Sequence, residues 1–85
     1  MRTAYVVTWC GYLADPKPTP RLTPDRPAAV AEVERLLGRE TVRALPENTR
    51  AVREFLEGRQ SCLIAWSAPF PHGGPFAFVT EVEVP

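Results

Sequence analysis

The sequence predicts a small α+β domain with the element order β-α-α-β-β: a three-stranded sheet, mixed or antiparallel, with two helices packed on one face. Three observations predict it. Hydrophobic residues alternate with period two near both ends of the chain. Between residues 27 and 57 they recur with helical spacing instead. The length of 85 residues allows one core and not two, so residues 1–85 are interpreted as a single domain.

The first predicted strand runs from Thr3 to Leu13. Its alternation places two sets of residues on opposite faces: Tyr5, Val7 and Trp9 on one, and Val6, Thr8 and Cys10 on the other. Both sets are fairly apolar. This favours a central strand that is covered on both sides, or a strand with one face at a dimer contact.

A proline-rich connector follows over residues 14–27 and carries five of the ten prolines, at positions 16, 18, 20, 24 and 27. Proline fixes φ and removes a backbone donor, so this segment can form neither a helix nor an inner strand. We interpret it as an extended surface connector, in preference to a polyproline ligand for an aromatic groove on another protein.

The first predicted helix runs from Pro27 to Leu37, with Thr23 or Asp25 as its N-terminal cap. The apolar stripe that is expected to face inward consists of Val30, Val33, Leu36 and Leu37. The side that is expected to face water carries Glu32, Glu34 and Arg35. Gly38 is suited to end it. Residues 39–45 fit a helical turn or a short strand, and the helical turn is favoured.

The second predicted helix opens at Pro46 and continues to Glu57, and Gly58 closes it. Three apolar residues are expected to face inward: Val52, Phe55 and Leu56. Arg50 and Arg53 form a basic stripe on this helix. Glutamates interleave with it at helical spacing, so intrahelical ion pairs are expected to neutralise much of it.

Two further strands are predicted from Ser61 to Ser67 and from Phe76 to Val84, joined by a loop rich in proline and glycine. One face of each strand carries the larger side chains: Cys62, Ile64 and Trp66 in the earlier strand, and Phe76, Phe78, Val82 and Val84 in the later one. The two strands are expected to be antiparallel neighbours. The first strand is expected beside one or the other of them in a mixed sheet.

Charge and hydropathy exclude several classes of partner. Ten basic and ten acidic residues give a net charge of zero, which disfavours a nucleic-acid binder that relies on phosphate contacts. The apolar runs, such as residues 63–66, fall far short of the ~20 residues that cross a bilayer. The N-terminal residues do not fit a secretory signal either. The chain is therefore predicted to be a cytoplasmic protein without membrane contact.

Two cysteines and one histidine are the candidate ligands or nucleophiles. Cys10 and Cys62 are interpreted as small buried hydrophobic residues, with a disulfide between them as the next alternative. Together with His72 they lack the close spacing of a zinc site, so no metal and no cofactor are predicted. His72 precedes two glycines. The sequence favours a turn there over a general base.

Aromatic residues concentrate on the predicted strands and at their ends. They exceed what one covered sheet face can hide, which is typical of an interaction surface. The candidate partner-binding residues are Trp9, Tyr12, Trp66, Phe70, His72 and Phe78.

The leading hypothesis is a small non-catalytic binding, adaptor or regulatory module that contacts a protein partner or a second copy of itself. The alternative is a small enzyme or ligand-binding protein. Its pocket would lie under the loop between Pro69 and Pro75, lined by Tyr12, Trp66 and His72.

Overall fold

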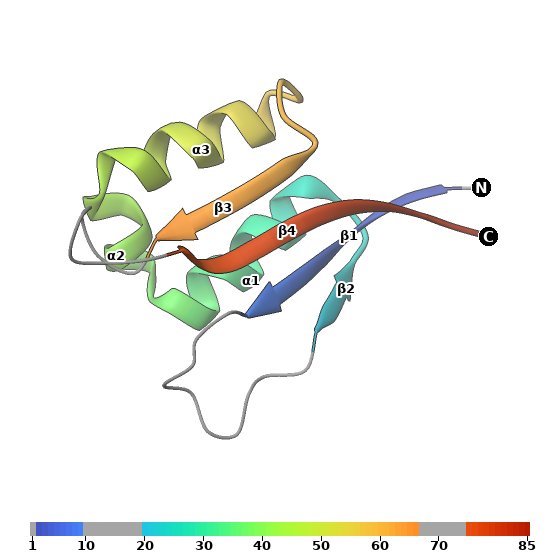
Figure 1. The fold of residues 1–85 in the computed structure, drawn as a ribbon, viewed down its shortest axis with the longest axis horizontal. Helices are drawn as coiled ribbons and strands as arrows, with labels where there is room; N and C mark the ends of the chain where they lie inside the picture. Colours follow the sequence, from blue (N-terminus) through green and yellow to red (C-terminus); the bar gives the residue numbers. More distant parts are fainter. Residues whose placement is uncertain (1, 10–19, 67–74) are drawn as a thin grey trace.

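Four strands and three helices form the part of the chain that the computed structural model describes, residues 2–9, 20–66 and 75–85. In chain order they are β1 (Arg2–Trp9), β2 (Arg21–Thr23), α1 (Arg26–Leu37), α2 (Arg39–Ala44), α3 (Pro46–Leu56), β3 (Cys62–Trp66) and β4 (Pro75–Val84). The strands form one sheet in the order β2-β1-β4-β3, and α1 passes behind it in Figure 1. The predicted α+β class is confirmed.

Every neighbouring pair of strands in this sheet is antiparallel. β4 lies between β1 and β3, so β1 has the last strand as its neighbour and runs in the same direction as β3 without touching it. Of the two predicted arrangements, the antiparallel sheet is confirmed and the mixed sheet is wrong. The counts of three strands and two helices are also wrong. β3 and β4 are antiparallel neighbours, as predicted.

The additional strand, β2, lies inside the predicted proline-rich connector. It pairs on one side only, with residues Tyr5 to Val7 of β1. Pro20 and Pro24 flank it and cannot donate a backbone hydrogen bond, which limits it to three residues at the edge of the sheet. In the described part of the connector, residues 20–27, the strand is thus an edge strand and not an inner one. The prediction missed a short edge strand, which proline does not forbid.

The additional helix, α2, occupies residues where a helical turn was favoured over a strand, and that preference is confirmed. Gly38 separates it from α1 with φ of 90°, a conformation that disfavours residues with a Cβ. Leu45 has an extended backbone and separates it from α3. Three short helices therefore replace the two that were expected.

The start of α1 is fixed by a side-chain cap. Asp25 accepts a hydrogen bond at Oδ1 from the backbone N–H of Ala28, at 2.8 Å. Thr23, the other candidate, belongs to β2, and its hydroxyl donates to the carbonyl oxygen of Tyr5 at 2.8 Å. The helix begins at Arg26 and ends at Leu37, within one residue of the prediction.

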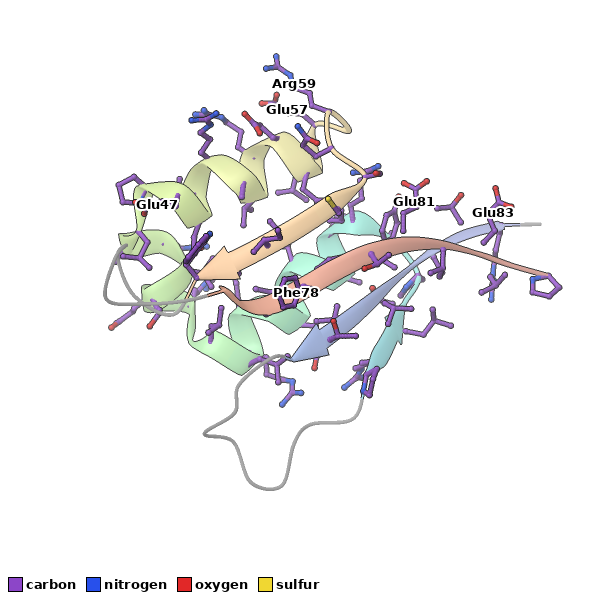
Figure 2. All side chains as sticks on the ribbon, in the orientation of Figure 1. Glu47, Glu57, Arg59, Phe78, Glu81 and Glu83 are labelled. Carbon is purple, nitrogen blue, oxygen red and sulfur yellow. The ribbon has the colours of Figure 1, made fainter. Side chains whose placement is uncertain are left out.

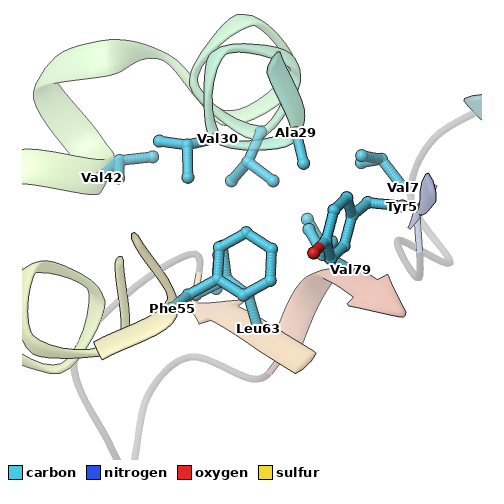
Figure 3. Packing of buried hydrophobic residues seen from close by; sticks show 11 residues of the cluster. Tyr5, Val7, Ala29, Val30, Val42, Phe55, Leu63 and Val79 are labelled. Carbon is cyan, nitrogen blue, oxygen red and sulfur yellow. The ribbon is translucent and has the colours of Figure 1, made fainter. Parts of the chain in front are cut away.

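The core lies between the helices and one face of the sheet (Figure 3). Its buried members come from β1, all three helices, β3 and β4: Tyr5, Val7, Ala29, Val30, Val33, Val42, Phe55, Leu63, Ala65, Ala77 and Val79. The rings of Phe55 and Tyr5 meet edge to face with centroids 5.5 Å apart. Leu56, which was expected to face inward, is 44% exposed. Phe55 is the residue of this turn that packs into the core.

Arg26 joins three elements at the edge of this core. Its guanidinium carbon lies 4.7 Å from the centre of the Phe55 ring, within the range of a cation–π contact. Nη1 donates to the carbonyl oxygens of Phe55, at 2.6 Å, and Gln60, at 2.7 Å. Nη2 contacts Glu81 of β4 at 3.2 Å. One arginine therefore ties α1 to the end of α3 and to the sheet.

Glu32 was expected to face water, but it is only 8% exposed. Arg35 donates to both of its carboxylate oxygens, with Nε at 3.1 and 3.2 Å. Arg21 of β2 lies 3.7 Å away. The hydrogen bonds from Arg35 lower the pKa of Glu32 below its ordinary value, against the opposing effect of burial. The two arginines cover the carboxylate, which is why it is not solvated.

This ion pair predicts a specific pH dependence of stability. Because the folded-state pKa of Glu32 is lowered, its contribution is fully present above the ordinary value of 4.5 and is lost as pH falls through the folded-state value. The gap in melting temperature between wild type and Glu32→Gln should be constant near neutral pH and shrink in acid. Glu40→Gln, at an exposed position of α2, is the control and should show no such convergence. A gap that does not change with pH would contradict the prediction.

Candidate binding surface

The sheet face away from the helices is covered by no helix or strand in the described part of the chain. Residues alternate along each strand, so the neighbours of the core residues point to this side. We call it the open face and define it by Leu22 of β2, Arg2, Ala4, Val6 and Thr8 of β1, Phe78, Thr80, Val82 and Val84 of β4, and Cys62 and Ile64 of β3.

Strand register brings these side chains into rows across the sheet. One row contains Ile64, Phe78 and Thr8, and the next contains Cys62, Thr80, Val6 and Leu22. Side chains directly opposite each other on neighbouring strands are close enough to pack. The open face is therefore one continuous surface that runs from β3 to β2.

Apolar side chains dominate the open face. Leu22 is 55% exposed and Ile64 is 42% exposed, two of the large hydrophobic residues that reach solvent. Phe78 and Val6 are half-buried. In Figure 2 the Phe78 side chain lies on the viewer's side of β4, with α1 behind the sheet. This is an apolar patch that spans four strands.

Charge is nearly absent from the open face. Arg2, in the last row of β1, is its one charged residue among those described. The polar residues nearer the middle are Thr8 and Thr80. The Thr8 hydroxyl lies 3.5 Å from the carbonyl oxygen of Phe78, and Thr80 is exposed.

The opposite side of the molecule carries the ion pairs. Seven arginines contact glutamates there: Arg21, Arg26, Arg35, Arg39, Arg43, Arg50 and Arg59. The predicted neutralisation of the basic stripe is confirmed for Arg50, whose Nε lies 3.3 Å from Glu54. Arg53 makes no ion pair with any described residue. The helical layer is thus a solvated, charge-balanced surface.

Two of the six predicted site residues, Trp66 and Phe78, are half-buried in the described part of the sheet. Phe78 lies on the open face. Trp66 follows a register irregularity after Ala65, so alternation does not assign its side chain to a face. Trp9 is the last residue of β1 and pairs with Ala77, but its side chain lies outside the described part. Tyr12, Phe70 and His72 also lie outside it, and so does the pocket expected between Pro69 and Pro75.

The ends of three strands nevertheless lie together. β1 ends at Trp9 opposite Ala77, and β3 ends at Trp66 opposite Pro75, where β4 begins. The chain therefore leaves the sheet at the ends of β1 and β3 and enters it at the starts of β2 and β4 on the same side, and these strand ends can be followed in Figure 1.

Asn48 is a structural residue that the sequence analysis missed. Its side chain in α3 is fully buried, with no exposed area. Nδ2 donates to the carbonyl oxygen of Trp66 at 2.9 Å, and Oδ1 accepts from the Trp66 N–H at 2.7 Å. The amide thus pairs with the end of β3 as a neighbouring strand would. A polar residue in the first turn of a helix carries no sequence signal that distinguishes this role from an exposed one.

The prediction that both cysteines are buried is wrong for Cys62. Cys62 is a free thiol and is exposed at the start of β3, because alternation places it on the open face and not among the core residues. Cys10, and with it the predicted alternative of a disulfide between the two cysteines, lies outside the described residues. The described residues contain no group of three or more His, Cys, Asp or Glu that could hold a metal ion.

A groove of about 450 Å³ lies on the helical side. Its apolar lining comes from all three helices: Val30, Val42, Val52 and Leu56. Charged residues at Glu34, Arg43, Arg53 and Glu57 surround it. Sequence patterns did not indicate this concavity, because it depends on the angles between three short helices.

Within the described ranges, no helix has both the length and the apolar character needed to cross a membrane. Comparison of the chain with profiles of protein families, with curated proteins and with solved structures finds no match.

Proposed function

We propose that this chain is a small non-catalytic binding module that contacts a protein partner through the open face of its sheet. The observation that carries the proposal is the continuous apolar surface across β2, β1, β4 and β3, which no described element covers. Apolar surface removed from water stabilises a complex by roughly 25 cal/mol per Å² before the costs of association. Contiguous patches of this kind mark interaction sites more often than isolated exposed residues do.

The chemistry of the open face favours a protein over a nucleic acid. Nucleic-acid binding requires several basic groups directed at phosphates, and this face carries only Arg2 at its margin. Its centre is formed instead by Val6, Phe78 and Val82 around the uncharged Thr80. Aliphatic and aromatic side chains at the centre of a patch, with charge confined to its border, resemble the core and rim of a protein interface.

A site-specific photo-crosslinker can test this proposal. Benzoylphenylalanine at position 80 would stand at the centre of the open face, because Thr80 is exposed and has Val6 and Cys62 as its cross-strand neighbours. Irradiation of cells that produce the full chain should give discrete intermolecular adducts. The same probe at Ala31, an exposed position on α1, should give none. Equal behaviour at the two positions would contradict the proposal.

A further inference from the structure

We infer that the partner of the open face is a second copy of the same chain, packed sheet against sheet around a two-fold axis. This inference rests on the proposed function, because it names the occupant of the same surface. Three features support it: the charge of the face, the charge of the rest of the molecule, and the area that the face offers.

The charge of the open face suits self-association. In a two-fold dimer, the same surface of each copy forms the interface. A charged group near the axis therefore faces the identical charge of the second copy. The open face has no carboxylate among the described residues, and its one cation, Arg2, lies in the last row and not at the centre. The chain as a whole carries ten basic and ten acidic residues, so two copies do not repel each other at long range.

The other large surface is less suited to dimerisation. On the helical side, arginines and glutamates already pair within the chain, as Arg35 does with Glu32 and Arg50 with Glu54. Burying such pairs would remove both charges from water, which costs more than their attraction returns unless every group keeps its hydrogen bonds. The sheet side has no such penalty. Association is therefore directed to the open face.

The area of the open face approaches that of a small specific interface. Four strands about 4.8 Å apart, with a mean length of about 6.5 residues at 3.3 Å each, cover roughly 400 Å² in plan. The relief of the side chains makes the accessible area larger, which approaches the roughly 600 Å² per partner of the smallest stable interfaces. The whole face is needed to reach that value. This favours an occupant of the same shape, which a second copy supplies.

Packing of two such sheets would bury the two central threonines. Thr8 already has the carbonyl oxygen of Phe78 at 3.5 Å as an acceptor within its own chain. Thr80 lies on the inner strand β4, between Val6 and Cys62 in register. A central position lies near the two-fold axis and therefore near its own equivalent. A charge at position 80 would be buried opposite the same charge.

Sedimentation equilibrium of the full chain tests this arrangement. Wild type should sediment as a dimer at about 100 µM, a concentration at which a micromolar dissociation constant gives nearly complete association. Thr80→Glu should sediment as a monomer at the same concentration. Ala31→Glu makes the same change of charge at an exposed position on the helical side and should remain dimeric.

A complementary pair of variants separates disruption of the interface from loss of folding. Thr80→Arg alone should also be monomeric. A mixture of Thr80→Glu and Thr80→Arg should recover the dimer, because opposite charges then meet across the axis. A misfolded variant would not be rescued by mixing. Monomeric wild type, a dimer that persists in Thr80→Glu, or failure of the mixture to recover would each overturn the inference.

The mass of the adduct at position 80 distinguishes this inference from the proposed function. A product of twice the chain mass agrees with both. A heavier product alone means that another protein binds the open face, so the second copy is excluded and the proposed function stands. A crosslink within one chain means that another segment of the chain covers the face, which overturns both.

Discussion

Phe55→Ala is expected to destabilise the fold by about 3–5 kcal/mol, the range for removing a fully buried phenylalanine ring. Phe55 has no exposed area and is the largest of the fully buried side chains among the described residues. Its ring packs edge to face on Tyr5 and under the guanidinium of Arg26, so truncation removes the partner of both. A cavity would remain between α3 and the sheet. Chemical denaturation followed by circular dichroism measures the loss.

This loss is a large part of the total free energy of unfolding. A domain of 85 residues has a free energy of unfolding of roughly 4–13 kcal/mol, so the variant should be close to unfolded at room temperature if wild type lies at the lower end. Phe55→Leu keeps most of the volume and should cost about 1–2 kcal/mol. Leu56→Ala, one position later and 44% exposed, is the matched control and should cost less than about 1 kcal/mol. Equal losses at positions 55 and 56 would show that the assignment of the inward residue is wrong.

Asn48→Ala is expected to cost about 2–4 kcal/mol, because it leaves both the N–H and the carbonyl of Trp66 without their partner. Each unsatisfied buried group costs about 1–3 kcal/mol, and water entering the vacated space recovers part of that. The measurement is denaturation together with hydrogen exchange at the Trp66 amide. Exchange there should accelerate in the variant more than at amides of β1.

Glu47→Ala provides the control for this second prediction. Glu47 is exposed in the first turn of the same helix, and its removal should cost less than about 1 kcal/mol through the helix dipole alone. The Trp66 amide should remain protected in this variant. If Asn48→Ala costs no more than Glu47→Ala and leaves that amide protected, the amide bridge is not a significant stabilising contact.

Some elements of the fold could be predicted because their causes are local. Alternation of apolar residues is enough to locate β1, β3 and β4 to within a few residues, and it correctly groups Leu63 with Ala65 opposite Ile64. Gly38 and the first-turn prolines mark the helix boundaries, because conformational restriction acts on the residue itself. Phe78, one of the predicted surface aromatic residues, lies on the face where the period-two pattern places it, together with Ile64 and Thr8.

Other elements could not be predicted because their causes are distant in sequence. β2 exists because residues 21–23 find a partner in β1, and β2 in turn brings Arg21 to within 3.7 Å of Glu32 on α1. Asn48 is a structural residue only because α3 brings it to the end of β3, 18 positions away. None of these pairs leaves a pattern in the neighbouring residues.

The sequence by itself determined the class of the fold, the two strand-forming ends and the helical middle, because local periodicity and proline or glycine restriction specify them. Only the tertiary structure decided the strand order β2-β1-β4-β3, and with it which of two apolar faces the helices cover. Both faces of β1 are apolar, and the face of β4 with the larger apolar side chains is not the one that the helices cover, so alternation alone cannot choose between the two faces. Packing chose the face with Val7, Ala77 and Val79, and left the face with Val6, Phe78 and Ile64 open. The smaller side chains of β4, Ala77 and Val79, leave room for the helices that Phe78 would fill.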